Sequence, residues 1–277
     1  MTQPERSTQL YEDFIPLADV SHIHRKWLDL EYANLSPSHK LDIYLPDEGD
    51  GLFPVILYLH GGAFSIGDKR DIYVLNILKS IKRGYAVVSV NYRLSGEAIF
   101  PAGIQDVKAA IRWIRANCKK YNLDGNRIGV WGCSSGANYA AMICLTDRVA
   151  EFDDLNLGNP EYTCNVQAAV EWFGPTDFLK MDEQARENGF GLTDHGEADS
   201  PESSFAHRPE KRKPVRGAGA PHCKGRTVSC PFQPLPQGMK SVTMMVYYTK
   251  ERGNGQKVFF RNYSKKRFAW EAFFVVS

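Results

Sequence analysis

Long apolar runs and a cysteine framework are both missing from this chain of 277 residues. No stretch approaches the ~20 consecutive apolar residues that a membrane-spanning helix needs, and the first residues show no basic region followed by an apolar run. Six cysteines are too few and too irregularly spaced in a chain of this length for a disulfide scaffold. We therefore expect free thiols, a cytoplasmic location and no association with a membrane.

Isoleucine, leucine and aspartate are nearly absent from the end of the chain. No Ile or Asp follows Asp199, and the one Leu after residue 205 is Leu235, whereas residues 1–205 hold 14 Ile and 19 Leu. Residues 206–277 carry a net charge of +12 and residues 1–205 one of −10, so the overall charge of +2 hides two opposite regions. Because Leu and Ile build ordinary cores, we expect an incomplete domain over 1–205 and a basic tail over 206–277 that does not continue its core.

The first region shows a regular alternation of strand and helix patterns. The period of two over 41–45 predicts a half-exposed antiparallel strand at a sheet edge. The apolar, β-branched runs over 54–59 and 85–90 predict buried parallel strands, with a helix between them from Val74 to Ile81. The pattern continues with a helix from Pro101 to Ile114, a strand over 127–131, a helix over 137–145 and a strand over 166–173. This alternation predicts an α/β fold with a doubly wound, mostly parallel sheet, whose functional residues follow the carboxyl ends of its strands.

A Gly-x-Ser-x-Gly motif, Gly132-Cys133-Ser134-Ser135-Gly136, joins the predicted strand 127–131 to the helix that follows. A serine at the apex of such a sharp turn needs neighbours without a β-carbon two residues away on either side, which Gly132 and Gly136 provide. The pattern selects Ser134 as a candidate nucleophile, with the backbone N–H of Ser135 facing the group that it attacks. The alternative is an ordinary turn of small residues that packs a helix on a strand.

A second motif, His60-Gly61-Gly62-Ala63-Phe64, follows the predicted strand 54–59 and so reaches the same edge of the sheet. Acyl transfer builds negative charge on the former carbonyl oxygen, and small residues allow backbone N–H groups to approach it. Gly62 and Ala63, together with Ser135, are the candidate oxyanion donors. We interpret His60 and Gly61 as support for this loop, because a histidine in such a loop braces it more often than it acts as a base.

Further stretches carry a resemblance to a known family. They cover residues 41–46, 60–64, 67–69, 91–95, 100–102, 106–110 and 172–177. Over about residues 27–205 the chain resembles α/β-hydrolase esterases and lipases of the hormone-sensitive-lipase-like and feruloyl/acetyl-xylan-esterase-like group. The resemblance implies a carboxylic ester hydrolase that acts through an acyl-serine intermediate, on a small-molecule ester with a short acyl group. Acetyl or feruloyl esters of sugars are candidates, and no cofactor is implied.

The acid and the base of the catalytic triad cannot be identified. The family usually supplies the acid in an H-G-x-x-D stretch and the histidine in a later Gly-rich loop, and the tail has neither. His207 and His222 both precede the best strand candidate of the tail, residues 242–248. Asp177 and His195 are weak candidates, since a turn cap and a solvated loop charge are the more ordinary roles for these two residues.

The basic tail allows other interpretations. His222, Cys223 and Cys230 lack the paired spacing of a zinc site, so we expect no metal. The basic residues between 208 and 226 could neutralise phosphates, but a solvated basic segment is favoured and we expect no nucleic-acid partner. We interpret the chain from about Ala206 onward as an out-of-frame or otherwise replaced C-terminus, not docked as native structure of this fold. Limited proteolysis should then cut first between Ala206 and Lys240.

Two functional hypotheses follow. The first is an ester hydrolase whose turnover is impaired because acid and base are missing, and the second is an inactive remnant or a binding protein of the same fold. Nothing in the sequence indicates the acyl specificity or the oligomeric state.

Overall fold

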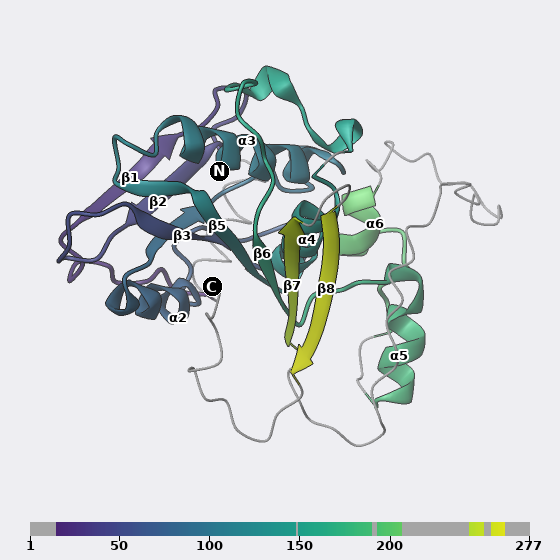
Figure 1. The fold of residues 1–277 in the computed structure, drawn as a ribbon. Coiled ribbons are helices and arrows are strands. Elements are labelled where there is room, and N and C mark those ends of the chain that lie inside the picture. The colour runs from purple at the N-terminus through teal and green to yellow at the C-terminus, as the bar shows by residue number, and fades with distance from the viewer. Residues whose placement is uncertain (1–14, 148, 190–192, 207–243, 252–255, 264–277) are drawn as a thin grey trace.

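A computed structural model describes residues 15–147, 149–189, 193–206, 244–251 and 256–263 of the chain. The described strands form one eight-stranded sheet in the order β1-β2-β4-β3-β5-β6-β7-β8 (Figure 1). The α/β fold predicted from the alternation of strands and helices is confirmed, with the difference that antiparallel strands flank the parallel centre on both sides.

Four parallel strands make the centre of the sheet. They are β3 (Phe53–Leu59), β4 (Ala86–Val90), β5 (Leu123–Cys133) and β6 (Ala168–Trp172), and β3 lies between β4 and β5. Every residue of β4 is buried, as its continuous apolar run predicts for a strand covered on both faces. The carboxyl ends of β3 and β5 are aligned, with Leu59 paired with Gly132, so the segments that follow them start side by side.

The strand predicted over 41–45 is β2 (Lys40–Tyr44), but its predicted place at a sheet edge and its predicted half-exposure are both wrong, since four of its five residues are buried. β2 pairs antiparallel with β4 on one side and with β1 (Lys26–Glu31) on the other. β1 has a register shift between Trp27 and Leu30, which disturbs the alternation of apolar and polar residues that would indicate a strand in the sequence. Asp42 is completely buried despite its charge, because the ion pairs described below compensate it.

Helices cover both faces of the parallel centre. α2 (Val74–Leu78), continued by a 3-10 turn over Lys79–Arg83 and closed by Gly84 in the left-handed conformation, packs on one face with the side chains of Ile56 and Val87. α3 (Ala102–Ala116) and α4 (Ser135–Leu145) pack on the other face. The predicted apolar face of α3, from Ile104 to Ile114, is buried as expected.

The segment after β6 carries two further helices, α5 (Met181–Glu187) and α6 (Pro201–Ala206). Short 3-10 turns lie at Ala150–Phe152, Leu155–Leu157 and Phe178–Lys180. Phe205 of α6 is buried and stacks on Phe64, with 4.1 Å between ring centroids, and its carbonyl accepts a hydrogen bond from the N–H of Phe100. This packing holds α6 against the loop that follows β3.

Two segments of the tail extend the sheet. β7 (Met244–Glu251) pairs antiparallel with β6, and β8 (Gln256–Tyr263) pairs antiparallel with β7. β7 overlaps the predicted strand 242–248 and adds to the sheet, but in the direction opposite to the parallel strands before it. The other tail residues named above, His207, His222, Cys223, Cys230 and the basic residues from 208 to 226, lie outside the described residues. The domain boundary near residue 205 stays a prediction.

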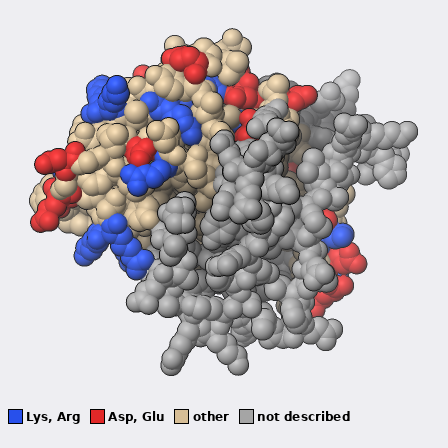
Figure 2. Space-filling view, viewed as in Figure 1, with Lys and Arg blue, Asp and Glu red and all other residues tan. Residues whose placement is uncertain are grey.

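The sequence also raised expectations about cysteine pairing, membrane-spanning helices and metal binding, which can be compared with the described residues. Cys118, Cys133, Cys144 and Cys164 are free thiols. None of the described helices is long and apolar enough to cross a membrane. The described residues contain no group of three or more His, Cys, Asp or Glu side chains that could hold a metal ion. Figure 2 shows acidic and basic side chains interspersed over the described part of one face.

Candidate active site

Ser134 stands at a sharp turn between β5 and α4. Its backbone has φ 53° and ψ −123°, outside the regions that residues with a β-carbon usually adopt, and its N–H donates to the carbonyl of Trp172 at 3.0 Å. A β-carbon on Gly132 would lie 2.0 Å from the Gly136 oxygen, and one on Gly136 would lie 2.3 Å from the carbonyl oxygen of His60. The two glycines are therefore required for this turn, as the motif predicts.

The loop after β3 faces this turn. A β-carbon on Gly61 would lie 3.2 Å from the β-carbon of Ser134, so the backbone of the loop passes close to the serine. Gly62, Ala63 and Phe64 have φ of 117°, 50° and 62°, three consecutive residues in the left-handed half of φ space. Such a backbone costs on the order of 1–3 kcal/mol for each residue with a side chain, and it is held here by the stacking of Phe64 on Phe205.

The candidate oxyanion donors lie at this junction. Ala63, Ser134 and Ser135 line one cavity, and Gly62 and Ser134 line a second. Ser135 is the first residue of α4, so its N–H belongs to the first turn, whose N–H groups have no acceptor within the helix. The structure thus brings together the serine and the backbone groups that the two sequence motifs select.

His60 lies beneath the loop instead of facing the cavities. Its side chain is buried and stacks on Tyr92, with 4.4 Å between ring centroids and 7° between planes. Its Nδ1 lies 2.7 Å from the Gly61 carbonyl oxygen, and the Tyr92 hydroxyl donates to the His60 carbonyl at 2.7 Å. Burial lowers the pKa of His60, which keeps the ring neutral. These contacts favour a bracing role over proton transfer.

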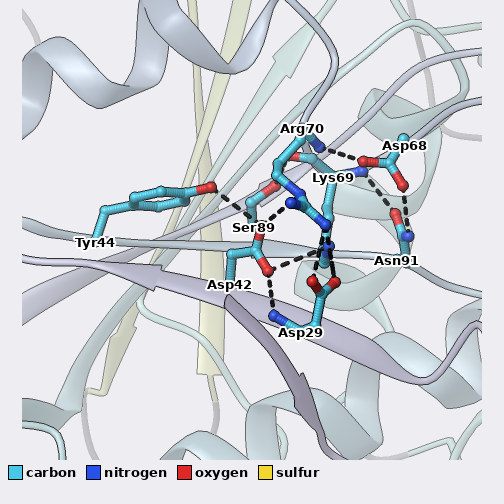
Figure 3. A network of polar contacts seen from close by, with 8 residues as sticks. All are labelled: Asp29, Asp42, Tyr44, Asp68, Lys69, Arg70, Ser89 and Asn91. Atoms are coloured by element: carbon cyan, nitrogen blue, oxygen red, sulfur yellow. Dashed lines mark hydrogen bonds and ion pairs between the residues drawn. The ribbon is translucent and has the colours of Figure 1, made fainter. Parts of the chain in front are cut away.

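Ion pairs around the buried side chains of Lys69 and Asp42 anchor the continuation of the loop (Figure 3). Lys69 is almost completely buried, and its Nζ lies 2.7 Å from Asp29 Oδ1 and 3.1 Å from Asp42 Oδ1. Arg70 pairs with the same two carboxylates through Nη2 and Nε, at 2.9 Å and 3.2 Å. Asp68 accepts a hydrogen bond from Asn91 at 2.9 Å. This group of side chains, here called the ion cluster, ties residues 68–70 to β1 and β2.

A cavity of about 510 Å3, here called the α5 cavity, opens on one side of Ser134. Its lining residues are Ala63, Phe64, Ser134, Ser135, Phe173, Gly174, Pro175, Met181, Gln184, Ala185, Asn188, His195 and Glu202. Of the two weak candidates for acid and base, His195 lines this cavity with Ser134 and Asp177 does not. Asp177 accepts a hydrogen bond from the N–H of Leu179 at 3.2 Å, a turn cap of the kind that the sequence favours.

His195 is held by a carboxylate that the sequence does not single out. Its Nδ1 lies 2.7 Å from Asp182 Oδ1, and the backbone N–H groups of His195 and Gly196 donate to Asp182 at 3.0 Å and 3.1 Å. The hydrogen bond from the imidazole lowers the pKa of Asp182. Asp182 precedes His195 by 13 residues in α5, where it resembles an ordinary acidic residue of a first helical turn, so no local pattern reveals the pair.

A second cavity of about 420 Å3 is also lined by Ser134 and is here called the Asp71 cavity. Its lining residues are Ile15, Tyr58, Gly61, Gly62, Asp71, Tyr73, Asn76, Ile77, Cys133, Ser134, Trp172 and Phe173. Burial raises the pKa of Asp71 to about 7. Ser134 thus lines both cavities.

Comparison with known protein families shows which family the chain belongs to. Residues 41–216, more than half of the chain, match the family described as BD-FAE. The chain belongs to this family. The resemblance to the α/β-hydrolase esterases stated above is thereby confirmed, and the matched segment of this BD-FAE chain contains both the loop after β3 and the turn at Ser134.

Curated relatives of the BD-FAE chain are named as esterases. The protein named "Probable carboxylic ester hydrolase LipM" from Mycobacterium tuberculosis is 29% identical over 180 residues, which cover 64% of this chain and 39% of the relative. The one named "Esterase LipQ" from the same organism is 34% identical over 175 residues, which cover 60% of this chain and 41% of the relative. The chain thus spans about two fifths of the length of these relatives.

Two solved structures have a fold similar to that of this chain. A structure named "Truncated form of carbohydrate esterase from gut microbiota" is 33% identical, with a TM-score of 0.58, over 69% of this chain and 68% of that one. A second, named "Bifunctional GH43-CE Bacteroides eggerthii", is 37% identical, with a TM-score of 0.58, over 66% of this chain and 26% of that one.

Proposed function

We propose that this chain hydrolyses carboxylic esters through an acyl-serine intermediate at Ser134. The observation that carries the proposal is the backbone of Ser134, with φ 53° at the end of β5, directly opposite a loop of three left-handed residues. Strain of this kind is stored where the surrounding structure needs one side chain in one place. The names of the relatives support the same class of reaction.

The proposed reaction proceeds in two steps. The Ser134 hydroxyl oxygen attacks the ester carbonyl carbon, the backbone N–H groups of Gly62, Ala63 and Ser135 stabilise the oxyanion, and the alcohol leaves with the serine proton. A water molecule then attacks the acyl-serine, its hydroxyl joining the acyl group and its other proton returning to the Ser134 oxygen. Each lost oxyanion donor would raise the barrier by about 2.7–4 kcal/mol.

Turnover is impaired in this proposal. Within the described residues, no hydrogen bond joins Ser134 Oγ to an imidazole, although His195 lines the same cavity. Loss of the histidine of a serine protease costs about 10⁶ in turnover and leaves roughly 10³–10⁴ over water from the oxyanion donors and binding. We infer a loss of similar size for this chain.

The proposed substrates are esters with short acyl groups, with acetyl and feruloyl esters of sugars as candidates. The similarity to a solved structure named as a carbohydrate esterase supports this choice.

Labelling with a fluorophosphonate tests the proposal. The full chain should be labelled slowly, because no described imidazole activates Ser134; the Ser134→Ala variant should not be labelled, and Ser135→Ala should keep the labelling because Ser135 contributes only its backbone N–H. Undiminished labelling of Ser134→Ala would show that Ser134 is not the nucleophile.

A second candidate function is an inactive remnant or a binding protein of the same fold. The lack of an imidazole bonded to Ser134 among the described residues favours it. The same labelling experiment separates the two, since the Ser134 of an inactive remnant or a binding protein is not labelled at all.

A further inference from the structure

Phe173, the residue directly after β6, lines both cavities described above. Among the described lining residues, the α5 cavity and the Asp71 cavity have Ser134 and Phe173 in common. The Phe173 ring lies 5.2 Å from the Trp172 ring, between centroids, and Trp172 also lines the Asp71 cavity. Phe173 is 50% exposed. Single exposed apolar residues are common on protein surfaces, so exposure alone indicates no function.

The backbone of Phe173 supplies a second, independent observation. Its φ is 49°, in the left-handed region that residues with a bulky side chain rarely adopt. Residues held in this region cluster at active sites and ligand contacts, where the surrounding structure compensates the strain. Burial of the ring is only a partial compensation here, because half of the residue stays exposed. The conformation therefore costs free energy for a side chain that the core does not enclose.

Hydrogen bonds on both sides of Phe173 hold this conformation. The carbonyl of Trp172, the residue before it, accepts from the Ser134 N–H at 3.0 Å. The carbonyl of Pro175, two residues after it, accepts from Nδ2 of Asn138 in α4 at 2.9 Å. The segment that carries Phe173 is thus tied to the serine turn and to the helix that follows this turn.

Gly174 brings the same segment into close contact with α4. A β-carbon on Gly174 would lie 2.8 Å from the β-carbon of Ala137 and 2.9 Å from the backbone nitrogen of Asn138. The Gly174 N–H donates to the side chain of Glu171, which is buried. The backbone at Phe173 therefore has a fixed position relative to Ser134, and a bulky group in the cavity cannot simply push the segment aside.

We propose that Phe173 contacts the acyl group of the ester and limits its bulk at the carbon next to the reacting carbonyl. This inference rests on the proposed function, because that carbon is separated from Ser134 Oγ by the carbonyl carbon alone in an acyl-serine. The acyl group then occupies a cavity that Ser134 lines, and Phe173 borders it in either of the two cavities. Phe173 is a specificity-determining residue that favours unbranched over branched acyl groups.

A purely structural role accounts less well for these observations. An aromatic side chain that stabilises a fold by packing is enclosed by its neighbours, since its contribution grows with the apolar area removed from water. Phe173 combines a half-exposed ring with a strained backbone, so it gives up part of that contribution. The same combination is expected of a side chain that is held ready to contact a ligand.

Hydrolysis of two p-nitrophenyl esters by the full chain tests the inference. The esters are the acetate and the 2,2-dimethylpropanoate, which differ in the methyl groups on the carbon next to the carbonyl, and the release that remains in Ser134→Ala is subtracted. Phe173→Ala and Phe173→Gly should each raise the ratio of the branched to the acetate rate by at least about 10-fold, because one methylene group of misfit is worth about 10- to 200-fold. The low reactivity of Ser134 affects both esters and cancels in this ratio.

Leu179→Ala is the matched control. Leu179 lies in the same segment after β6, is 92% exposed and lines neither cavity, so its removal should leave the ratio unchanged. Urea denaturation checks the strained backbone. Glycine adopts a positive φ without steric cost, so Phe173→Gly should have a higher urea midpoint than Phe173→Ala. If one of these two variants does not fold, the other still gives the ratio.

Four results would overturn the inference. An unchanged ratio in the Phe173 variants, with release that depends on Ser134, would show that Phe173 does not limit the acyl group and would leave the proposed function intact. An equal rise in Leu179→Ala would indicate a general loosening of the segment. A higher urea midpoint for Phe173→Ala than for Phe173→Gly would remove the strain on which the inference depends. Absence of any release that depends on Ser134 would contradict the proposed function, and the inference with it.

Discussion

At the scale of single residues, the space around Ser134 excludes β-carbons at defined positions. Gly136 packs against the end of β3 so closely that a β-carbon would lie 2.3 Å from the carbonyl oxygens of both Leu59 and His60. Backbone atoms cannot rotate away as the end of a side chain can. The turn at the serine and the loop opposite it are therefore one packed unit.

This packing predicts the effect of adding one methyl group. Gly136→Ala should lower the free energy of unfolding by about 1–3 kcal/mol, as overpacking does, and should abolish labelling of Ser134 by a fluorophosphonate. Gly129→Ala, in the same strand-turn-helix segment, is the control, because its β-carbon would meet nothing nearer than the Ala168 oxygen at 3.7 Å. Equal labelling of the two variants would contradict the geometry.

His195 supplies a second prediction at this scale. Because no described imidazole is bonded to Ser134, we expect p-nitrophenyl acetate turnover far below the roughly 1–10³ per second typical of enzymes, and a change of less than about threefold in His195→Ala. A companion variant is Asp182→Asn, which keeps the imidazole but alters its partner and the acceptor of the His195 and Gly196 N–H groups. Turnover within the typical range that falls by about 10² or more in His195→Ala would instead identify His195 as the base.

At the scale of elements, the ion cluster connects three pieces of chain. β1 supplies Asp29, β2 supplies Asp42, and the loop between β3 and α2 supplies Lys69 and Arg70 (Figure 3). Burial raises the pKa of Asp42, even though Lys69 and Arg70 oppose that effect. The cluster holds the loop that carries Gly62, Ala63 and Asp71.

Removing one partner from this cluster should be costly. Lys69→Met leaves the fully buried Asp42 with less compensation and should lower the free energy of unfolding by about 3–5 kcal/mol, measured by urea denaturation. Lys180→Met, which removes the exposed ion pair with Asp177 at 3.8 Å, should cost less than about 1 kcal/mol. A loss of similar size in both variants would mean that the cluster has no special role.

At the scale of the whole molecule, two buried carboxyl groups should make stability depend on pH. Burial raises the pKa of Asp71 and of Glu171 to about 7, whereas unfolded chains release these protons near pH 4. Between about pH 4 and 7 the folded state therefore holds more protons than the unfolded state, and the free energy of unfolding falls as pH rises.

Urea unfolding at pH 5, 6, 7 and 8 checks this dependence. The double variant Asp71→Asn, Glu171→Gln should show a flatter profile and should be more stable than the original chain at pH 8, by on the order of 1 kcal/mol. An identical slope in both proteins would show that neither group keeps its proton in the folded state.

In the whole molecule, local sequence patterns predict some features of the fold and miss others. The parallel centre, the faces of α3 and the turn at Ser134 follow from runs and spacings within a few residues, so they could be predicted. The place of β2 could not, because it depends on a neighbour, β1, whose register shift hides its alternation. The pairing of Asp182 with His195 could not be predicted either, since Asp182 lies in α5 and His195 lies in the segment that follows this helix.

The sequence by itself determined which residues can form the serine turn and its facing loop, because small residues at fixed spacing are a local steric requirement. Only the tertiary structure decided that Ser134 lines two cavities, that Asp182 holds His195 in the lining of one of them, and that Asp71 and Trp172, which line the other, each have a buried polar atom without a partner among the described residues. The physical reason is that these groupings join segments far apart along the chain. Charge compensation and cavity shape depend on distances in space, and the sheet sets those distances.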